Sequence, residues 1–142
     1  MILAAILTSA IPLTTQASAG AHVTVTVRDL RSERGQVLAC LTTQPKAFPD
    51  CSHDPLSHKL KVPAAHVVEL DFGAVPQGNY AISLVHDENG NGKMDTRLML
   101  PREGYGFSRN APVRMGPPKF ASAAFDVGGT AEHLDIRMRY ML

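Results

Sequence analysis

The chain of 142 residues is long enough for one domain with a buried core, and its 14 Lys and Arg side chains nearly balance 13 Asp and Glu. Because the formal net charge is only +1 and the charges are interspersed, the composition excludes an extended basic surface for nucleic acid or for a membrane. We therefore expect partners to be recognised by shape or by a local site.

The first 19 residues predict a signal peptide for export. Residues 2–13 are largely apolar and uncharged, and the small residues Ala17 and Ala19 predict cleavage before Gly20. An apolar run of 12 residues is too short to span a bilayer. We expect residues 20–142 to form one mature domain that is periplasmic or secreted and not membrane-spanning after cleavage.

Most of the mature chain alternates apolar and polar residues with a period of two, which is typical of β-strands with one buried face. No helix of normal length is indicated. This pattern predicts an all-β fold, a single antiparallel β-sandwich of about seven or eight strands, immunoglobulin-like or transthyretin-like. The expected strands span residues 22–30, 36–42, 59–62, 66–72, 80–86, 97–100, 120–127 and 132–142.

The two cysteines, Cys40 and Cys51, are 11 residues apart and form no Cys-x-x-Cys motif. In an exported protein such a pair predicts a disulfide rather than a metal or redox site. Closing this short loop would stabilise the fold by roughly 3 kcal/mol. The bond would hold residues 43–55, whose three prolines disfavour regular structure.

Residues 87–95 place oxygen-bearing side chains at alternate positions, with glycine at the sixth position and a carboxylate at the ninth. Ca²⁺ takes six to eight oxygen ligands, and a chain that curls around the ion supplies them from every second residue. The spacing therefore predicts a Ca²⁺-binding loop. The expected ligands are the side-chain oxygens of Asp87, Asn89, Asn91 and Asp95 and the backbone carbonyl of Lys93.

The twelfth position of this loop is Leu98, where an EF-hand has a bidentate Glu, and no helical pattern flanks the loop. The expected affinity is therefore weak, roughly 0.1 to 1 mM. A metal-free hairpin connection explains the same residues, because Asn-Gly pairs favour tight turns. The sequence leaves both alternatives open.

Residues 101–119 are rich in glycine and proline and show no clear period. Irregular segments of this length are usually functional or disordered. Tyr105 and Phe107 would either present two rings to a sugar or peptide, or plug the open end of the sandwich. Arg109 and Asn110 would bind a carboxylate, or hydrogen-bond to loop carbonyls. No catalytic residue is indicated, since Ser108 lacks the context of a nucleophile elbow.

Four blocks occur in order: Val-Pro-Gln-Gly-Asn-Tyr-Ala-Ile at 75–82, His-Asp-Glu-Asn-Gly-Asn-Gly-Lys-Met-Asp at 86–95, Glu-Gly-Tyr-Gly-Phe-Ser-Arg-Asn-Ala at 103–111 and Gly-Pro-Pro-Lys-Phe at 116–120. Together they resemble the bacterial exported family known as domain of unknown function 2141, over about residues 22–138. The resemblance implies a small secreted or periplasmic sandwich of prealbumin-like or transthyretin-like type. It is similar to regulatory domains appended to peptidases and outer-membrane receptors, and the family has no established activity. The cysteine pair resembles a subset of relatives and implies a local crosslink.

We expect an exported binding or structural module of the cell envelope rather than an enzyme, with a loop that binds Ca²⁺ weakly. Its partner would be an envelope protein, a peptide or a glycan, and not nucleic acid. One alternative is a hydrolase or isomerase acting on an envelope substrate, which rests on fold analogy alone. Another is an accessory or chaperone-like subunit that engages its partner through a sheet edge.

Overall fold

The computed structural model describes residues 9–13, 20–94, 96–97 and 100–141. Most of the predicted signal peptide, the predicted ligand Asp95 and the loop's twelfth position, Leu98, lie outside the described residues. Within the described ranges, no helix has the length and apolar character needed to cross a membrane.

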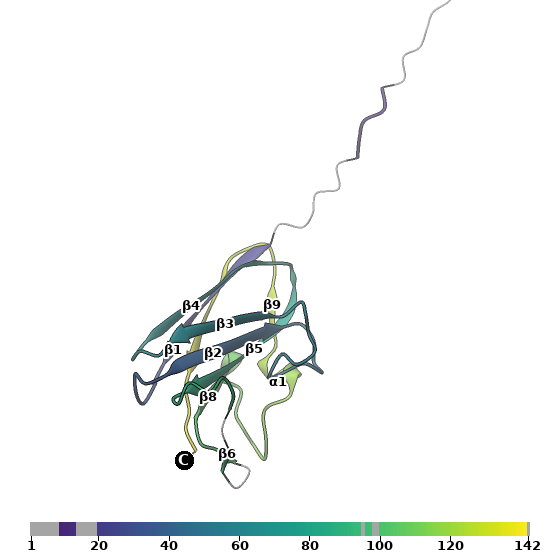
Figure 1. Ribbon diagram of the computed structural model, residues 1–142. Coiled ribbons are helices and arrows are strands. Elements are labelled where there is room, and N and C mark those ends of the chain that lie inside the picture. Colours follow the sequence, from purple (N-terminus) through teal and green to yellow (C-terminus); the bar gives the residue numbers. More distant parts are fainter. Residues whose placement is uncertain (1–8, 14–19, 95, 98–99, 142) are drawn as a thin grey trace, which may run out of the picture.

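Two sheets pack face to face, which confirms the all-β sandwich (Figure 1). The three-stranded sheet has the order β10-β1-β4 and consists of β1 (Ala21–Arg28), β4 (Val68–Val75) and β10 (Glu132–Arg137). The five-stranded sheet has the order β3-β2-β5-β8, with β9 also paired to β5. Its strands are β2 (Gln36–Thr42), β3 (His58–Pro63), β5 (Gly78–Asp87), β8 (Gly104–Phe107) and β9 (Phe125–Val127).

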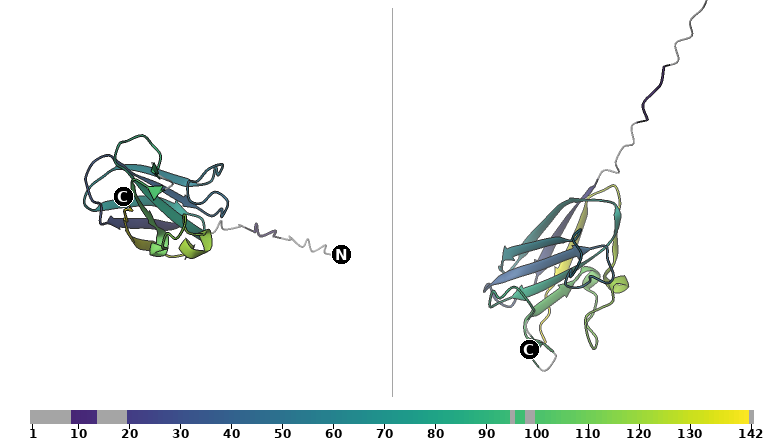
Figure 2. Two further views of the ribbon diagram at one scale, coloured as in Figure 1. Left: turned by 90° about the horizontal axis from the view of Figure 1, so that it is seen from below. Right: turned by 45° about the vertical axis from the view of Figure 1, so that its right-hand side comes forward.

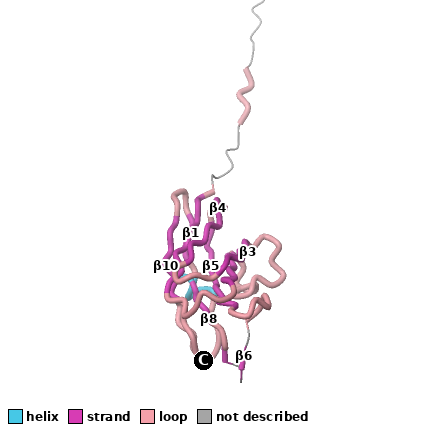
Figure 3. Tube along the Cα trace, turned by 60° about the vertical axis from the view of Figure 1, so that its left-hand side comes forward, coloured by secondary structure: helices cyan, strands magenta, loops and turns pink. Residues whose placement is uncertain are grey.

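The remaining regular structure is short. Strands β6 (Thr96–Arg97) and β7 (Leu100–Pro101) pair with each other, and η1 (Ser108–Asn110) and α1 (Phe120–Ala123) are single turns. Figure 3 shows how little of the chain is helical. One pairing departs from the antiparallel expectation, because β1 and β10 run parallel. The last strand thus adds to the first along the same direction and completes the three-stranded sheet.

The main core lies between the sheets, where the apolar positions of the period-two pattern meet. Three valines of β1 face inward with no exposed surface, opposite Leu84 of β5. The approach of the sheets is close near β8: a Cβ on Gly106 would lie 2.9 Å from Ile136 Cγ2 and 3.2 Å from Met138 Sδ. A glycine at this position therefore allows β8 to pack directly on the β10 segment.

A second, smaller apolar cluster covers the outer face of the five-stranded sheet. Its buried members are Ala81, Tyr105, Phe107, Ala111 and Ala123. The loop between β2 and β3 lies over this face, because Cys40 of β2 is joined to Cys51 by the predicted disulfide, with a Cα–Cα distance of 5.9 Å. Phe48 of the same loop packs on Phe107, with ring centroids 5.8 Å apart.

Four sequence expectations about strands were wrong. Arg97 and Leu100, expected in one strand, belong to β6 and β7 and pair with each other. Residues 104–107 form a strand that the pattern did not show, because glycines occupy its inward positions instead of large apolar residues. Residues 120–127 are a helical turn followed by a three-residue strand, since Ala123 belongs to the outer cluster whereas Val127 enters the main core. The last strand ends at Arg137, after which the chain crosses to β8 through an isolated bridge between Tyr105 and Arg139.

Candidate cation-binding loop

Strand β5 delivers the loop from a rigid position. His86 and Asp87 are its last two residues and both are fully buried. Asp87 lies opposite Gln36 of β2, whose Nε2 donates to Asp87 Oδ2 at 2.8 Å. Asp87, the first predicted ligand, is therefore fixed by the sheet, and the curled part of the loop begins after it.

The loop curls around the Asp87 carboxylate. The backbone N–H of Asn91 donates to Asp87 Oδ1 at 3.1 Å, and that of Gly92 donates to Oδ2 at 2.7 Å. The Asn89 side-chain oxygen accepts the same Asn91 N–H at 3.1 Å, and the Asn91 oxygen accepts the Lys93 N–H at 3.1 Å. The three alternate side-chain oxygens thus face the loop's own backbone. The left-handed turn at Gly92, with φ of 80°, needs a residue without Cβ.

Glu88 ties the loop to the turn between β1 and β2. Its side chain is only 10% exposed, and its oxygens accept Arg31 Nε at 2.9 Å and Ser32 Oγ at 2.8 Å. Desolvation opposes ionisation of this carboxyl, but the hydrogen bonds from Arg31 and Ser32 and the Arg31 charge outweigh it and lower the Glu88 pKa. Sequence reasoning missed Glu88, because its partners lie more than 50 residues away in the chain.

The oxygen set suits a hard cation. Carboxylate, amide and backbone oxygens are the donors that Ca²⁺ prefers, whereas Zn²⁺ prefers nitrogen and sulfur. Among the described residues, no group of three or more His, Cys, Asp or Glu could hold a metal ion, and Asp95 lies outside them. A carboxylate has about four acceptor positions, and the described partners of Asp87 take three. Asp87 is thus bonded by Gln36 and by the loop backbone, and its binding of a cation remains a prediction.

The four predicted ligand-binding residues are not gathered at one surface. Tyr105 and Phe107 are each 7% exposed and pack on each other in the outer cluster, with ring centroids 6.1 Å apart. Asn110 binds the free edge of β10, where it donates to the Asp135 carbonyl at 3.3 Å and accepts the Arg137 N–H at 3.0 Å. Arg109 is exposed and lies 3.5 Å from the Ala124 carbonyl. Their binding of a ligand remains a prediction.

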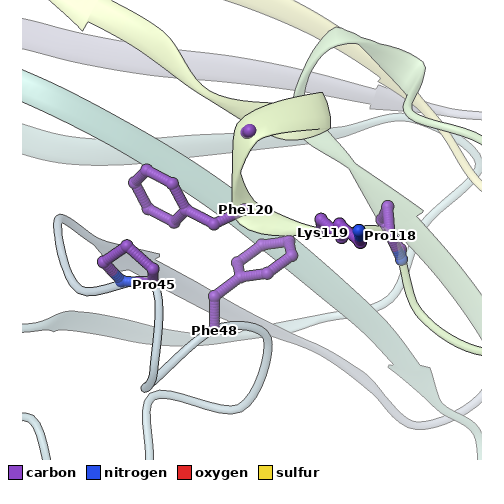
Figure 4. Close-up of a pocket in the computed structure, with 6 residues that line it drawn as sticks. Pro45, Phe48, Pro118, Lys119 and Phe120 are labelled. Carbon is purple, nitrogen blue, oxygen red and sulfur yellow. The ribbon is translucent and has the colours of Figure 1, made fainter.

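A shallow open hollow of about 400 Å³ lies instead between the disulfide-held loop and the start of α1 (Figure 4). Phe48 and Phe120 meet there edge to face, with ring centroids 6.0 Å apart. The sequence did not predict this hollow, because its two sides come from segments that are far apart in the chain. It is lined by Pro45, Phe48, Pro118, Lys119, Phe120 and Ala121.

A hydrolase or isomerase site would need a cleft that joins His86, Asp95 and Arg109, and the described members of this set do not form one. His86 is fully buried and uses both ring nitrogens in hydrogen bonds, whereas Arg109 is exposed on η1. The third residue, Asp95, lies outside the described ranges. The hydrolase or isomerase alternative therefore gains no support from the arrangement of these side chains.

Comparison with known proteins identifies the family. No curated protein and no solved structure matches the chain. A family model described as "Uncharacterized protein conserved in bacteria (DUF2141)" matches residues 25–135. The match runs from β1 into β10 and includes the whole of the 87–95 loop. The chain therefore belongs to this bacterial family, as the four sequence blocks indicate.

Proposed function

We propose that the protein is an exported binding or structural module of the cell envelope whose 87–95 loop binds Ca²⁺. The observation that carries the proposal is the curl of the loop around Asp87, with the Asn89 and Asn91 oxygens turned toward the loop backbone. Hydrogen bonds that hold the loop in this conformation would reduce the conformational entropy lost on binding.

Two further observations support the proposal. The Cys40–Cys51 disulfide fits an oxidising compartment outside the cytoplasm. The loop also offers few carboxylates, and a small ligand charge corresponds to the weak affinities of extracellular Ca²⁺ modules, roughly 0.1 to 1 mM. A cation that binds only the native state stabilises it by about 1.4 kcal/mol at ten times the Kd.

Thermal unfolding in EDTA, in 10 mM Ca²⁺ and in 10 mM Mg²⁺ tests this function. At 10 to 100 times the Kd, we expect Ca²⁺ to raise the Tm of the mature chain by roughly 5 to 10 °C. The variant Asn89→Ala should lose this response. Asp50→Ala is the matched control, since Asp50 Oδ1 accepts the Ser52 N–H at 2.9 Å in the same two-residue turn geometry, but in the disulfide-held loop. A wild-type Tm that does not respond to 10 mM Ca²⁺ would remove the cation from the proposal.

Binding through a sheet edge has less support. β3 and β4 each pair with a neighbour on one side only among the described strands. The exposed side chains of β3 include Lys59 and Lys61, and those of β4 include Glu69 and Asp71. Charged side chains on edge strands are typical of sheets protected against pairing with another chain. The loop is therefore the better candidate for a binding site.

A further inference from the structure

A chain of hydrogen bonds runs from the buried His86, the residue before Asp87, to the partly exposed Tyr140 and the exposed Arg31. His86 Nε2 lies 2.8 Å from the Arg34 carbonyl oxygen, and His86 Nδ1 lies 2.7 Å from the Tyr140 hydroxyl. The carbonyl only accepts, so Nε2 donates, and in the tautomer that carries its hydrogen on Nε2 the Nδ1 atom accepts the Tyr140 O–H. The Tyr140 oxygen in turn accepts the backbone N–H of Arg31 at 3.1 Å. Every group in this chain has a partner.

The Tyr140 ring also contacts Arg31, which forms an ion pair with Glu88, the residue after Asp87. The Arg31 guanidinium lies over that ring, 4.5 Å from its centroid, and the same guanidinium forms the ion pair with Glu88. Tyr140 thus contacts His86 directly and Glu88 through Arg31. These two residues flank Asp87, on which the loop curls.

Gly104 of β8 has no side chain, and the Tyr140 ring lies in the space that this leaves. A Cβ on Gly104 would lie 2.4 Å from Tyr140 Cε1, so the ring occupies the space that a side chain would fill. Burial, which is the main cause, raises the pKa of Tyr140, and the nearby Glu88 charge adds to this effect. The hydroxyl therefore keeps its proton, and remains a donor, to a higher pH than the hydroxyl of an exposed tyrosine.

The C-terminal segment that carries Tyr140 is held by three backbone hydrogen bonds. The Met138 N–H donates to the Arg28 carbonyl at 2.9 Å, and Tyr105 and Arg139 exchange bonds of 3.0 and 2.8 Å. Figures 1 and 3 show the C-terminal end of the chain at the same end of the sandwich as β6, which follows the loop, and the right-hand view of Figure 2 also shows the C-terminus at the lower end of the sandwich. The segment is thus a separate element that docks against β1 and β8 next to the loop.

We propose that Tyr140 is a positioning residue for the cation loop: its hydroxyl and ring hold His86 and Glu88, and so link loop order to docking of residues 138–140. The link to Ca²⁺ rests on the proposed function, whereas the link to loop order does not. Because coupling between two binding events is reciprocal, Ca²⁺ should strengthen docking of the C-terminal segment by the same factor by which docking strengthens Ca²⁺ binding.

The test compares Tyr140→Phe with Tyr80→Phe in the mature chain. Both hydroxyls are hydrogen-bonded, but that of Tyr80 donates to the Pro76 carbonyl at 2.8 Å, before β5 begins. Two measurements are made on each variant: Ca²⁺ affinity by titration calorimetry, and hydrogen exchange of the Asn91 and Gly92 amides in EDTA. We expect Tyr140→Phe alone to weaken Ca²⁺ binding about tenfold, a typical coupling between linked sites, and to speed exchange of both amides.

The two measurements separate this inference from the proposed function. Equal exchange rates in the two variants would overturn the positioning role, whether or not the wild type binds Ca²⁺. Faster exchange in Tyr140→Phe alone, with a wild type that binds no Ca²⁺, would support the positioning role and overturn the proposed function. Slower exchange of the Met138 and Arg139 amides on addition of Ca²⁺ to the wild type would support the reciprocal link, and unchanged exchange would overturn it.

Discussion

Replacing Glu88 by Gln tests the contact between the loop and the β1–β2 turn. The change keeps the shape of the side chain but removes its charge and places an NH₂ donor among the donors of Arg31 and Ser32. A charge-assisted hydrogen bond contributes about 1.5 to 3 kcal/mol. Arg31 is 40% exposed and Arg34 is 77% exposed, so solvent screens part of the attraction. We expect the variant to be less stable by about 1 to 2 kcal/mol at pH 7.

The direction of the pH dependence follows from the lowered pKa of Glu88. In the unfolded chain a Glu titrates near about 4.3, and in the folded chain Glu88 titrates below its usual range. The carboxylate therefore contributes its full stabilisation above roughly pH 5 and loses it as the pH falls through the folded pKa. The difference between wild type and variant should shrink over that range.

Urea unfolding of both proteins, from pH 7 downward in steps, measures this difference as a change in the free energy of unfolding. Glu33→Gln is the control, because Glu33 belongs to the same turn but is 60% exposed and pairs with His66 at 3.6 Å, a long contact at the surface. Its effect at pH 7 should stay within about 0.5 kcal/mol. A Glu88→Gln effect as small as that of the control, or one that does not change with pH, would refute the argument.

Three further predictions concern the parts of the fold that support the loop and the outer face. Replacing both Cys40 and Cys51 by Ala should lower the free energy of unfolding by roughly 3 kcal/mol in urea, and a wild type whose stability is unchanged by reductant would contradict this. Gly106→Ala should cost about 1 to 3 kcal/mol, because its Cβ would press on Ile136 Cγ2; a neutral effect on Tm would show that the sheets have room to separate. Asn110→Ala should lower stability by about 1 kcal/mol and increase light scattering at high concentration, because it uncovers the edge of β10; a monomeric variant of unchanged stability would argue against that role.

The sequence predicted correctly those features that depend on residues close together in the chain. Alternation in β1 and the cysteine spacing predicted the sandwich and the disulfide, because side chains of a strand alternate between faces whatever the strand pairs with. The same reasoning missed β8, where glycines alternate with aromatic rings. Glycine marks a close approach between two elements, and only the position of Ile136 and Tyr140 reveals what approaches.

The aromatic pair shows the same limit. From the sequence, Tyr105 and Phe107 were compatible with a ligand surface, but a plug at the open end of the sandwich was the favoured interpretation. The structure places them on the outer face of the five-stranded sheet, beneath the disulfide-held loop. Which face a strand turns to the core depends on its partner strand, and the pairing of β8 with β5 is not encoded in residues 101–119 alone.

By itself, the sequence determined that the chain is an all-β domain with a crosslinked loop and an oxygen-rich turn, because strand alternation and turn residues act over short distances. Only the tertiary structure decided that His86, Glu88 and Arg31 meet around Tyr140, since these contacts join residues 54 to 109 positions apart. Such contacts form when the strands pair, and no local spacing specifies them. The residues of the loop can thus be identified from the sequence, whereas the contacts of His86, Glu88 and Arg31 that hold the loop form only in the folded protein.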